Sequence, residues 1–166
     1  MKQSKFIKTL TMAILLMVPL GASAEMFTQG AKRFSVLLGR GQAYGDNYTI
    51  LGGFGYYVYD GLELAINWDT WLGGDPDINQ ITPEVRYVFR TRSAIDPYVG
   101  ALYRWTSVSG FDDETAYGFR AGVYIKAGRR SYIGIGAAYI ETTSCDERVY
   151  VSCSDTYPEF SYAIAF

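Results

Sequence analysis

Apolar and polar residues alternate with a period of two along most of this chain, and this pattern limits the fold more than any other feature. The clearest stretch is LELAINWDTW, residues 62–71, in which every second residue from Leu62 to Trp68 is apolar. The final residues, EFSYAIAF, alternate in the same way up to Phe166. A period of two places successive side chains on opposite faces of a β-strand, whereas an amphipathic helix needs a period of about 3.6. The pattern therefore predicts an all-β fold.

Eight strands of this kind are expected. They lie near residues 32–41, 47–59, 62–71, 82–90, 98–106, 116–126, 132–139 and 159–166. The first two alternate less cleanly, so the sequence leaves open which way their faces point. Pro83 lies in the fourth strand, where its missing N–H predicts either a bulge or a strand that pairs fully only from Glu84.

The connections between these strands differ in length at the two ends. Those at 60–61, 90–96 and 127–130 are short, and Asp60–Gly61 is typical of a tight hairpin. Those near 41–47, 72–78, 107–114 and 142–156 are richer in Gly, Asp, Ser and Thr, and the last is the longest. Short turns at one end and longer loops at the other are typical of an eight-stranded antiparallel up-and-down transmembrane β-barrel.

A secreted soluble β-sandwich is the main alternative, because it also has strands of period two. The chemistry of the faces separates the two folds. The polar face of the later strands is rich in Gly and Ala with isolated Arg and Glu, and small residues suit the crowded interior of a closed barrel. The other face is apolar and aromatic along several strands, and lipid can cover all of it. The face chemistry therefore favours the membrane barrel.

The first 24 residues predict a cleaved secretory signal peptide. Lys2, Lys5 and Lys8 precede the apolar run LTMAILLMVPL, and Ala22 and Ala24 are small enough for signal peptidase. The run is too short for a membrane-spanning helix, which needs about 20 apolar residues. Residues 25–166 then form one barrel domain. Without the three lysines, 12 basic and 17 acidic residues remain, so nothing suggests a nucleic-acid partner.

The chain resembles the small eight-stranded outer-membrane protein superfamily of Gram-negative bacteria, which includes outer-membrane protein X and the transmembrane domain of outer-membrane protein A. The signal peptide, the eight strands, IDPYVGALYRWT at the fifth strand and the final YAIAF carry this resemblance. It implies that Tyr162, Ile164 and Phe166 form the signal read by the barrel-assembly machinery. It also implies a monomer in the outer membrane, with both termini periplasmic and with lipid and lipopolysaccharide as neighbours.

Charged residues on the inward faces predict an ion-pair network. Counted from the periplasmic end of each strand, they fall at a similar depth: Asp69, Glu84, Arg86, Arg104, Arg120 and Glu159. The lumen of an eight-stranded barrel has room for side chains and little else, and buried charges must pair. We expect the network to fill the lumen, either as structural packing or as a gate.

The two rims carry opposite charge, and neither predicts a metal site. The outer loops hold acidic residues that include Asp112, Asp113 and Glu114, and the periplasmic turns hold Arg90, Arg92, Arg129 and Arg130. The acidic run lacks the spacing of a calcium loop, so a solvated loop is favoured over a cation site. The only two cysteines, Cys145 and Cys153, lie in the last loop, and in an oxidising compartment they are expected to form a disulfide. No cofactor is implied.

Three classes of function are compatible with such a barrel. The first is a structural or surface-interaction protein with a plugged lumen, and the second is a narrow passive channel for small, including apolar, solutes. The third is an outer-membrane enzyme such as a lipid A deacylase, a lipid A palmitoyltransferase or a barrel protease. Those enzyme families rely on a catalytic histidine, and this chain has none. The crowded, charged interior favours the first class.

Overall fold

The computed structural model describes residues 26–41, 47–72, 78–110, 112–143 and 153–166. The predicted signal peptide and Cys145 lie outside these residues, as does part of each of the four longer loops. The cleavage site and the disulfide with Cys153 therefore stay predictions. Among the described residues, no helix has the length and apolar character needed to cross a membrane.

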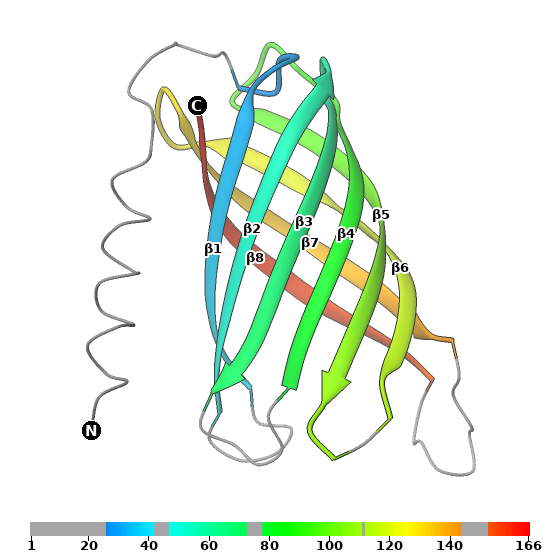
Figure 1. Cartoon of the computed structure of the whole chain (residues 1–166). Coiled ribbons are helices and arrows are strands. Elements are labelled where there is room, and N and C mark those ends of the chain that lie inside the picture. The colour runs from blue at the N-terminus through cyan, green and yellow to red at the C-terminus, as the bar shows by residue number, and fades with distance from the viewer. Residues whose placement is uncertain (1–25, 42–46, 73–77, 111, 144–152) are drawn as a thin grey trace, which may run out of the picture.

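Eight antiparallel strands form one closed barrel, as predicted, and neighbours in the sequence are neighbours in the sheet (Figure 1). The strands are β1 (Lys32–Gly41), β2 (Asn47–Tyr59), β3 (Leu62–Leu72), β4 (Ile78–Val88), β5 (Ile95–Val108), β6 (Glu114–Lys126), β7 (Ser131–Thr142) and β8 (Ser154–Ala165). The short turns and the end of β8 lie at one end of the barrel, called here the turn end (Figure 1). The strand ends that flank the longer connections lie at the opposite end, called here the loop end (Figure 1).

The register of the strands tilts them strongly around the barrel. A walk across paired residues starts at Ala165 in β8, circles the barrel once and returns to β8 ten residues away, at Asp155. Its steps are Ala165, Arg33, Gly55, Ala65, Glu84, Leu102, Gly118, Ile140 and Asp155. A stagger of this kind accompanies strand tilts of about 35–45°. Inward residues that meet in the lumen therefore lie at different distances from the ends of their own strands.

The two faces of the sheet differ as the alternation predicts. In β3, Glu63 and Asp69 are 0% and 4% exposed, whereas Ile66 and Trp68 are 52% and 61% exposed. Every strand presents such an exposed apolar or aromatic side chain, for example Phe34, Phe54, Trp68, Val85, Trp105, Phe119, Ile135 and Phe160. The structure also resolves the facing of the first two strands, because Arg33 and Tyr57 are buried and Phe34 and Tyr56 are exposed. The barrel thus has an apolar wall around a polar lumen.

Strand β8 closes the barrel against β1. Their pairing runs from Arg33 opposite Ala165 to Val36 opposite Tyr162. Beyond it, Lys32 and Phe166 exchange two backbone hydrogen bonds of 2.9 Å each. Phe166 therefore takes part in the closure directly.

Pro83 lies inside β4 without a bulge, so both sequence-based options are wrong. Toward β3 the ladder continues, with Ile66 opposite Pro83. Toward β5 the pairing stops at Ile81, opposite Trp105, and resumes at Glu84, opposite Leu102. The same number of residues is skipped on both strands, so the register is unchanged. The missing N–H of proline therefore interrupts one ladder locally.

The predicted hairpin at Asp60–Gly61 is present and depends on glycine. Gly61 has φ +79°, and a Cβ there would lie 2.5 Å from the carbonyl oxygen of Val88. Gly110 has a similar φ of +87° but has open space around its Cα. Comparing alanine substitutions at Gly61 and Gly110 therefore separates the free-energy cost of a positive φ from that of a steric collision.

We expect Gly61→Ala to destabilise the barrel more than Gly110→Ala. A positive φ costs a non-glycine residue about 1–2 kcal/mol, and both variants incur this cost. Only Gly61→Ala also displaces the backbone of β4, which should add at least about 1 kcal/mol. Urea unfolding of the two variants in lipid vesicles measures the difference. Equal losses would show that the turn can relax around a Cβ.

Candidate functional site

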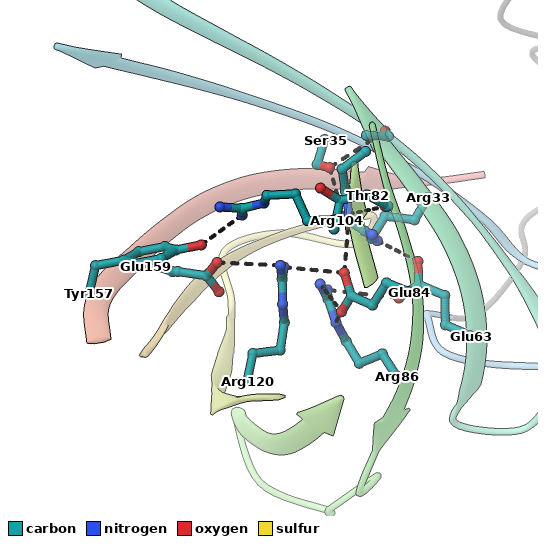
Figure 2. Close-up of polar contacts among 12 residues, drawn as sticks. Arg33, Ser35, Glu63, Thr82, Glu84, Arg86, Arg104, Arg120, Tyr157 and Glu159 are labelled. Carbon is teal, nitrogen blue, oxygen red and sulfur yellow. Dashed lines mark hydrogen bonds and ion pairs between the residues drawn. The ribbon is translucent and has the colours of Figure 1, made fainter. Parts of the chain in front are cut away.

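The lumen holds a chain of alternating acidic and basic side chains, which we call the charged tier. Inward positions on five strands contribute its members: Arg33, Glu63, Glu84, Arg86, Arg120 and Glu159. Figure 2 shows these side chains pointing toward one another from different sides of the barrel. Three guanidinium groups and three carboxylates balance in charge.

One half of the charged tier lies between β1, β3 and β4. The Nε of Arg33 lies 2.5 Å from Oε1 of Glu63, and Nη1 of Arg33 donates to the hydroxyl of Ser35 at 2.7 Å. The other carboxylate oxygen of Glu63 lies 3.8 Å from Nη1 of Arg86 and accepts from the hydroxyl of Tyr57 at 3.4 Å. These side chains are almost fully buried, so their charges depend on one another rather than on water.

The other half is centred on Glu84. Arg86 approaches Oε1 of this carboxylate through Nη2 at 2.6 Å and Nε at 2.7 Å. Arg120 lies 3.2 Å from Oε2 of Glu84 and 3.5 Å from Oε1 of Glu159, and Asn67 donates to Oε2 of Glu84 at 3.1 Å. Contacts thus run without a break through inward side chains of β1, β3, β4, β6 and β8.

The structure brings four of the six predicted network residues together and leaves two apart. Asp69 is buried but forms no ion pair within the described part of the chain, and one of its carboxylate oxygens has no partner there. Arg104 also lacks a carboxylate there; it donates to the hydroxyl of Tyr157 at 2.8 Å and lies 5.9 Å from that ring. Neither residue is joined to the charged tier by an ion pair in the described part of the chain, so their place in the network stays a prediction.

The bounds of the strands explain why Asp69 and Arg104 lie apart from the charged tier. Strand β4 ends at Val88 and β5 begins at Ile95, so Glu84 is fifth from the turn end of its strand and Arg104 is tenth. Asp69 is eighth from the turn end of β3. Asp69 and Arg104 therefore lie nearer the loop end than Glu84 does.

Arg33 and Glu63 belong to the network but were not predicted there. Glu63 occupies a polar position of the alternating stretch 62–71, so the period of two already places it on the inward face. Arg33 lies in the first strand, whose facing the sequence left open. Lys32 and Phe34, on either side of Arg33, point outward. Arg33 and Ser35 therefore share the inward face of this strand.

Small inward residues leave the space that these side chains fill. A Cβ at Gly100 would lie 3.1 Å from Oε1 of Glu84 and 3.3 Å from Cγ of Arg120. Near the turn end, a Cβ at Gly134 would lie 2.8 Å from the ring of Tyr124. The Gly-rich polar face in the sequence therefore corresponds to close packing inside the barrel.

A second layer, which we call the aromatic tier, closes the turn end. It comprises Phe27, Tyr57, Tyr98, Tyr124 and Tyr132, all at most 4% exposed. The ring of Phe27 lies 5.6 Å from Tyr124, 5.0 Å from Tyr132 and 5.9 Å from Tyr57. Arg86 joins the two tiers, because its guanidinium lies 5.1 Å from the ring of Tyr98 and it donates to the hydroxyl of Tyr124.

Phe27 reaches this layer from a segment that the sequence did not single out. It has φ +64°, which is uncommon for a residue with a side chain. Backbone hydrogen bonds hold the segment in place: Gly61 donates to the carbonyl of Phe27, and Gly30 donates to that of Tyr57, both at 2.8 Å. The strained residue therefore persists because its surroundings fix it.

The remaining predicted residues lie on the wall or near the loop end. Tyr162 and Ile164 point outward and are 51% and 44% exposed. Cys153 lies immediately before β8, where its carbonyl accepts from the N–H of Thr142. Among the described residues there is no group of His, Cys, Asp or Glu side chains placed to hold a metal ion. The arrangement can pack and neutralise charge, and it presents no donor set for metal chemistry in that part of the chain.

Comparison with known proteins gives structural neighbours only. No protein-family model and no curated protein matches the sequence. The N-terminal β-barrel domain of OprF from Pseudomonas aeruginosa is 14% identical, with a TM-score of 0.66, and the match covers 83% of this chain and 98% of that one. Neisserial surface protein A is 16% identical with a TM-score of 0.50, over 81% and 92% of the two chains.

A designed transmembrane β-barrel is a further neighbour. It is 14% identical, with a TM-score of 0.50 and coverage of 86% of this chain and 98% of that one. At such identities the likeness concerns the fold alone. At that level the predicted resemblance is confirmed: the chain has the eight-stranded barrel fold of these small outer-membrane proteins.

Proposed function

We propose that this protein is an integral outer-membrane barrel with a structural or surface-interaction role and a lumen closed to solutes. One observation carries the proposal: the charged tier links inward side chains of β1, β3, β4, β6 and β8, and each of its charges lies against an opposite one. An eight-stranded barrel encloses little more than its own side chains. A solute crossing the lumen would have to separate buried ion pairs.

The aromatic tier supports the same role. It lies at the turn end of the charged tier, so the two layers stand in series along the lumen. A rearrangement of the ion pairs alone would still leave Phe27 packed between Tyr124 and Tyr132. The absence of histidine further supports a non-enzymatic role, because the barrel enzymes considered above depend on it.

We infer the orientation from the barrel architecture. In outer-membrane barrels the short turns are periplasmic and the longer loops extracellular. Both chain termini would then be periplasmic, and the acidic loops would face the lipopolysaccharide layer. The surface role would belong to the loops, and assembly of the barrel would involve the residues at the end of β8.

A narrow passive channel is the second candidate, and one observation favours it. Seven buried polar atoms lack hydrogen-bond partners among the described residues, and three of them lie nearer the loop end than the charged tier: Oδ1 of Asp69, Oγ1 of Thr82 and Nε of Arg104. Buried polar groups of this kind are commonly satisfied by water. A hydrated outer half of the lumen suits a channel, but the two tiers interrupt the path below it.

The charged tier predicts a specific result for Arg120→Ala. This change leaves Glu159 without its cation and removes one of two from Glu84, so it should cost about 3 kcal/mol of unfolding free energy. In a planar bilayer, neither the wild type nor the variant should conduct, because the aromatic tier is untouched. Arg129→Ala, at an exposed arginine in the β6–β7 turn, is the control and should alter neither property.

Stepwise conductance of the wild-type barrel would contradict the closed lumen and favour the channel. An unchanged unfolding midpoint for Arg120→Ala would show that its ion pairs contribute nothing to stability.

The closure of β8 against β1 predicts an assembly defect for Phe166→Asp. The change puts a carboxylate where β8 joins β1, beside the outward apolar row of Tyr162 and Ile164, so folded barrel should accumulate more slowly in cells. Phe166→Trp keeps a large aromatic and should assemble normally. Migration in detergent gels with and without heating reports the folded fraction. Equal yields of the two variants would remove Phe166 from the assembly signal.

A further inference from the structure

Five basic residues form a ring at the turn end, which we call the basic collar. Its members are Lys32, Arg90, Arg92, Arg129 and Arg130. The nearby carboxylates neutralise only part of it. Asp60 pairs with Arg90 at 2.9 Å, and Asp96 pairs with Lys126 at 3.0 Å. Lys32, Arg92 and Arg129 are exposed and form no ion pair among the described residues.

The opposite end of the barrel has the reverse charge. Asp112 and Asp113 between β5 and β6, and Asp155 in β8, are exposed acidic side chains near the loop end. The molecule is therefore electrically asymmetric along its axis. The basic end attracts an anionic surface that lies next to it.

Exposed aromatic residues lie next to the collar on the outer wall. Tyr59 is 65% exposed, and Tyr87 and Phe89 form an edge-to-face pair with ring centroids 5.0 Å apart. Outward aromatic side chains of this kind mark the level of the lipid headgroups around a membrane barrel. Lys32 belongs to the same outward row of β1 as Phe34. The collar therefore lies at headgroup level, where long basic side chains extend to reach phosphate.

The distribution of the collar indicates its partner. Its cations come from β1, from the β4–β5 turn and from the β6–β7 turn, which are spread around the closed barrel (Figure 1). A single docked protein would contact one patch, whereas a shell of lipid contacts the whole circumference. Guanidinium groups also match the geometry of phosphate oxygens.

We propose that the basic collar binds the headgroups of anionic phospholipids in the leaflet around the turn end. The inference rests on the proposed membrane location. It adds a preference for one class of lipid, and it assigns that preference to Lys32, Arg92 and Arg129 in particular. The acidic loop end takes no part in it.

The test uses the barrel folded in nanodiscs that contain equal amounts of phosphatidylcholine and phosphatidylglycerol, followed by native mass spectrometry of the lipids retained on the protein. The wild type should retain the anionic lipid at least about fivefold over the zwitterionic one, the factor that one basic side chain supplies near an anionic surface. The triple variant Lys32→Gln, Arg92→Gln, Arg129→Gln should lose this enrichment.

The matched control neutralises three charges at the other end, with Asp112→Asn, Asp113→Asn and Asp155→Asn, and should keep the enrichment. Inorganic phosphate at constant ionic strength should not displace the lipid, and displacement would contradict a lipid-headgroup surface by revealing a phosphate site. Equal lipid ratios for the wild type and the collar variant would overturn the proposal. Heat-modifiable migration verifies folding separately, and a wild type that fails to insert would instead contradict the membrane location.

Discussion

Charge enclosed in a narrow tube is costly unless it is paired, and most of the buried charge in this structure is arranged around that constraint. The lumen of eight strands is too small to hydrate the six charged side chains of the charged tier freely. Within this tier, three carboxylates and three guanidinium groups take inward positions, and the stagger of the strands brings them into alternating contact. Because a buried ion pair is costly to break from one side, each contact also restrains the strands that carry it.

The alternation along each strand gives the barrel two faces with different chemistry. The wall is apolar on every strand, which suits lipid, while the interior alternates long charged residues with glycine and alanine. Gly100 shows the dependence most clearly, because a side chain there would press on both Glu84 and Arg120. The small residues of the lumen therefore leave the space that its long charged side chains need.

Much of this architecture could be predicted from the sequence, because a period of two is a direct consequence of strand geometry. The strand number, the apolar outer face and the inward placement of Glu84, Arg86, Arg120 and Glu159 all follow from it. The depth of a side chain does not, since it depends on where each strand begins. Asp69 and Arg104 lie apart from the charged tier for this reason.

Other features had no periodic signal in the sequence. Phe27 lies outside any strand, and its position in the aromatic tier depends on hydrogen bonds from Gly61 and on a positive φ. Pro83 appeared to require an irregular strand, yet one interrupted ladder accommodates it because the register on both sides is already fixed. Both cases depend on tertiary contacts that a single strand pattern does not contain.

The central claim is that buried charges in the lumen stabilise the barrel only as pairs, and a double-mutant cycle on Arg33 and Glu63 tests it most directly. These two residues join β1 to β3 through a 2.5 Å contact. Arg33→Met and Glu63→Met should each lower the unfolding free energy by about 3–5 kcal/mol, because each leaves a buried charge without its main partner. The double variant should lose far less than the two losses combined. Losses that simply add would contradict the account, because they would show that the two side chains stabilise the barrel independently.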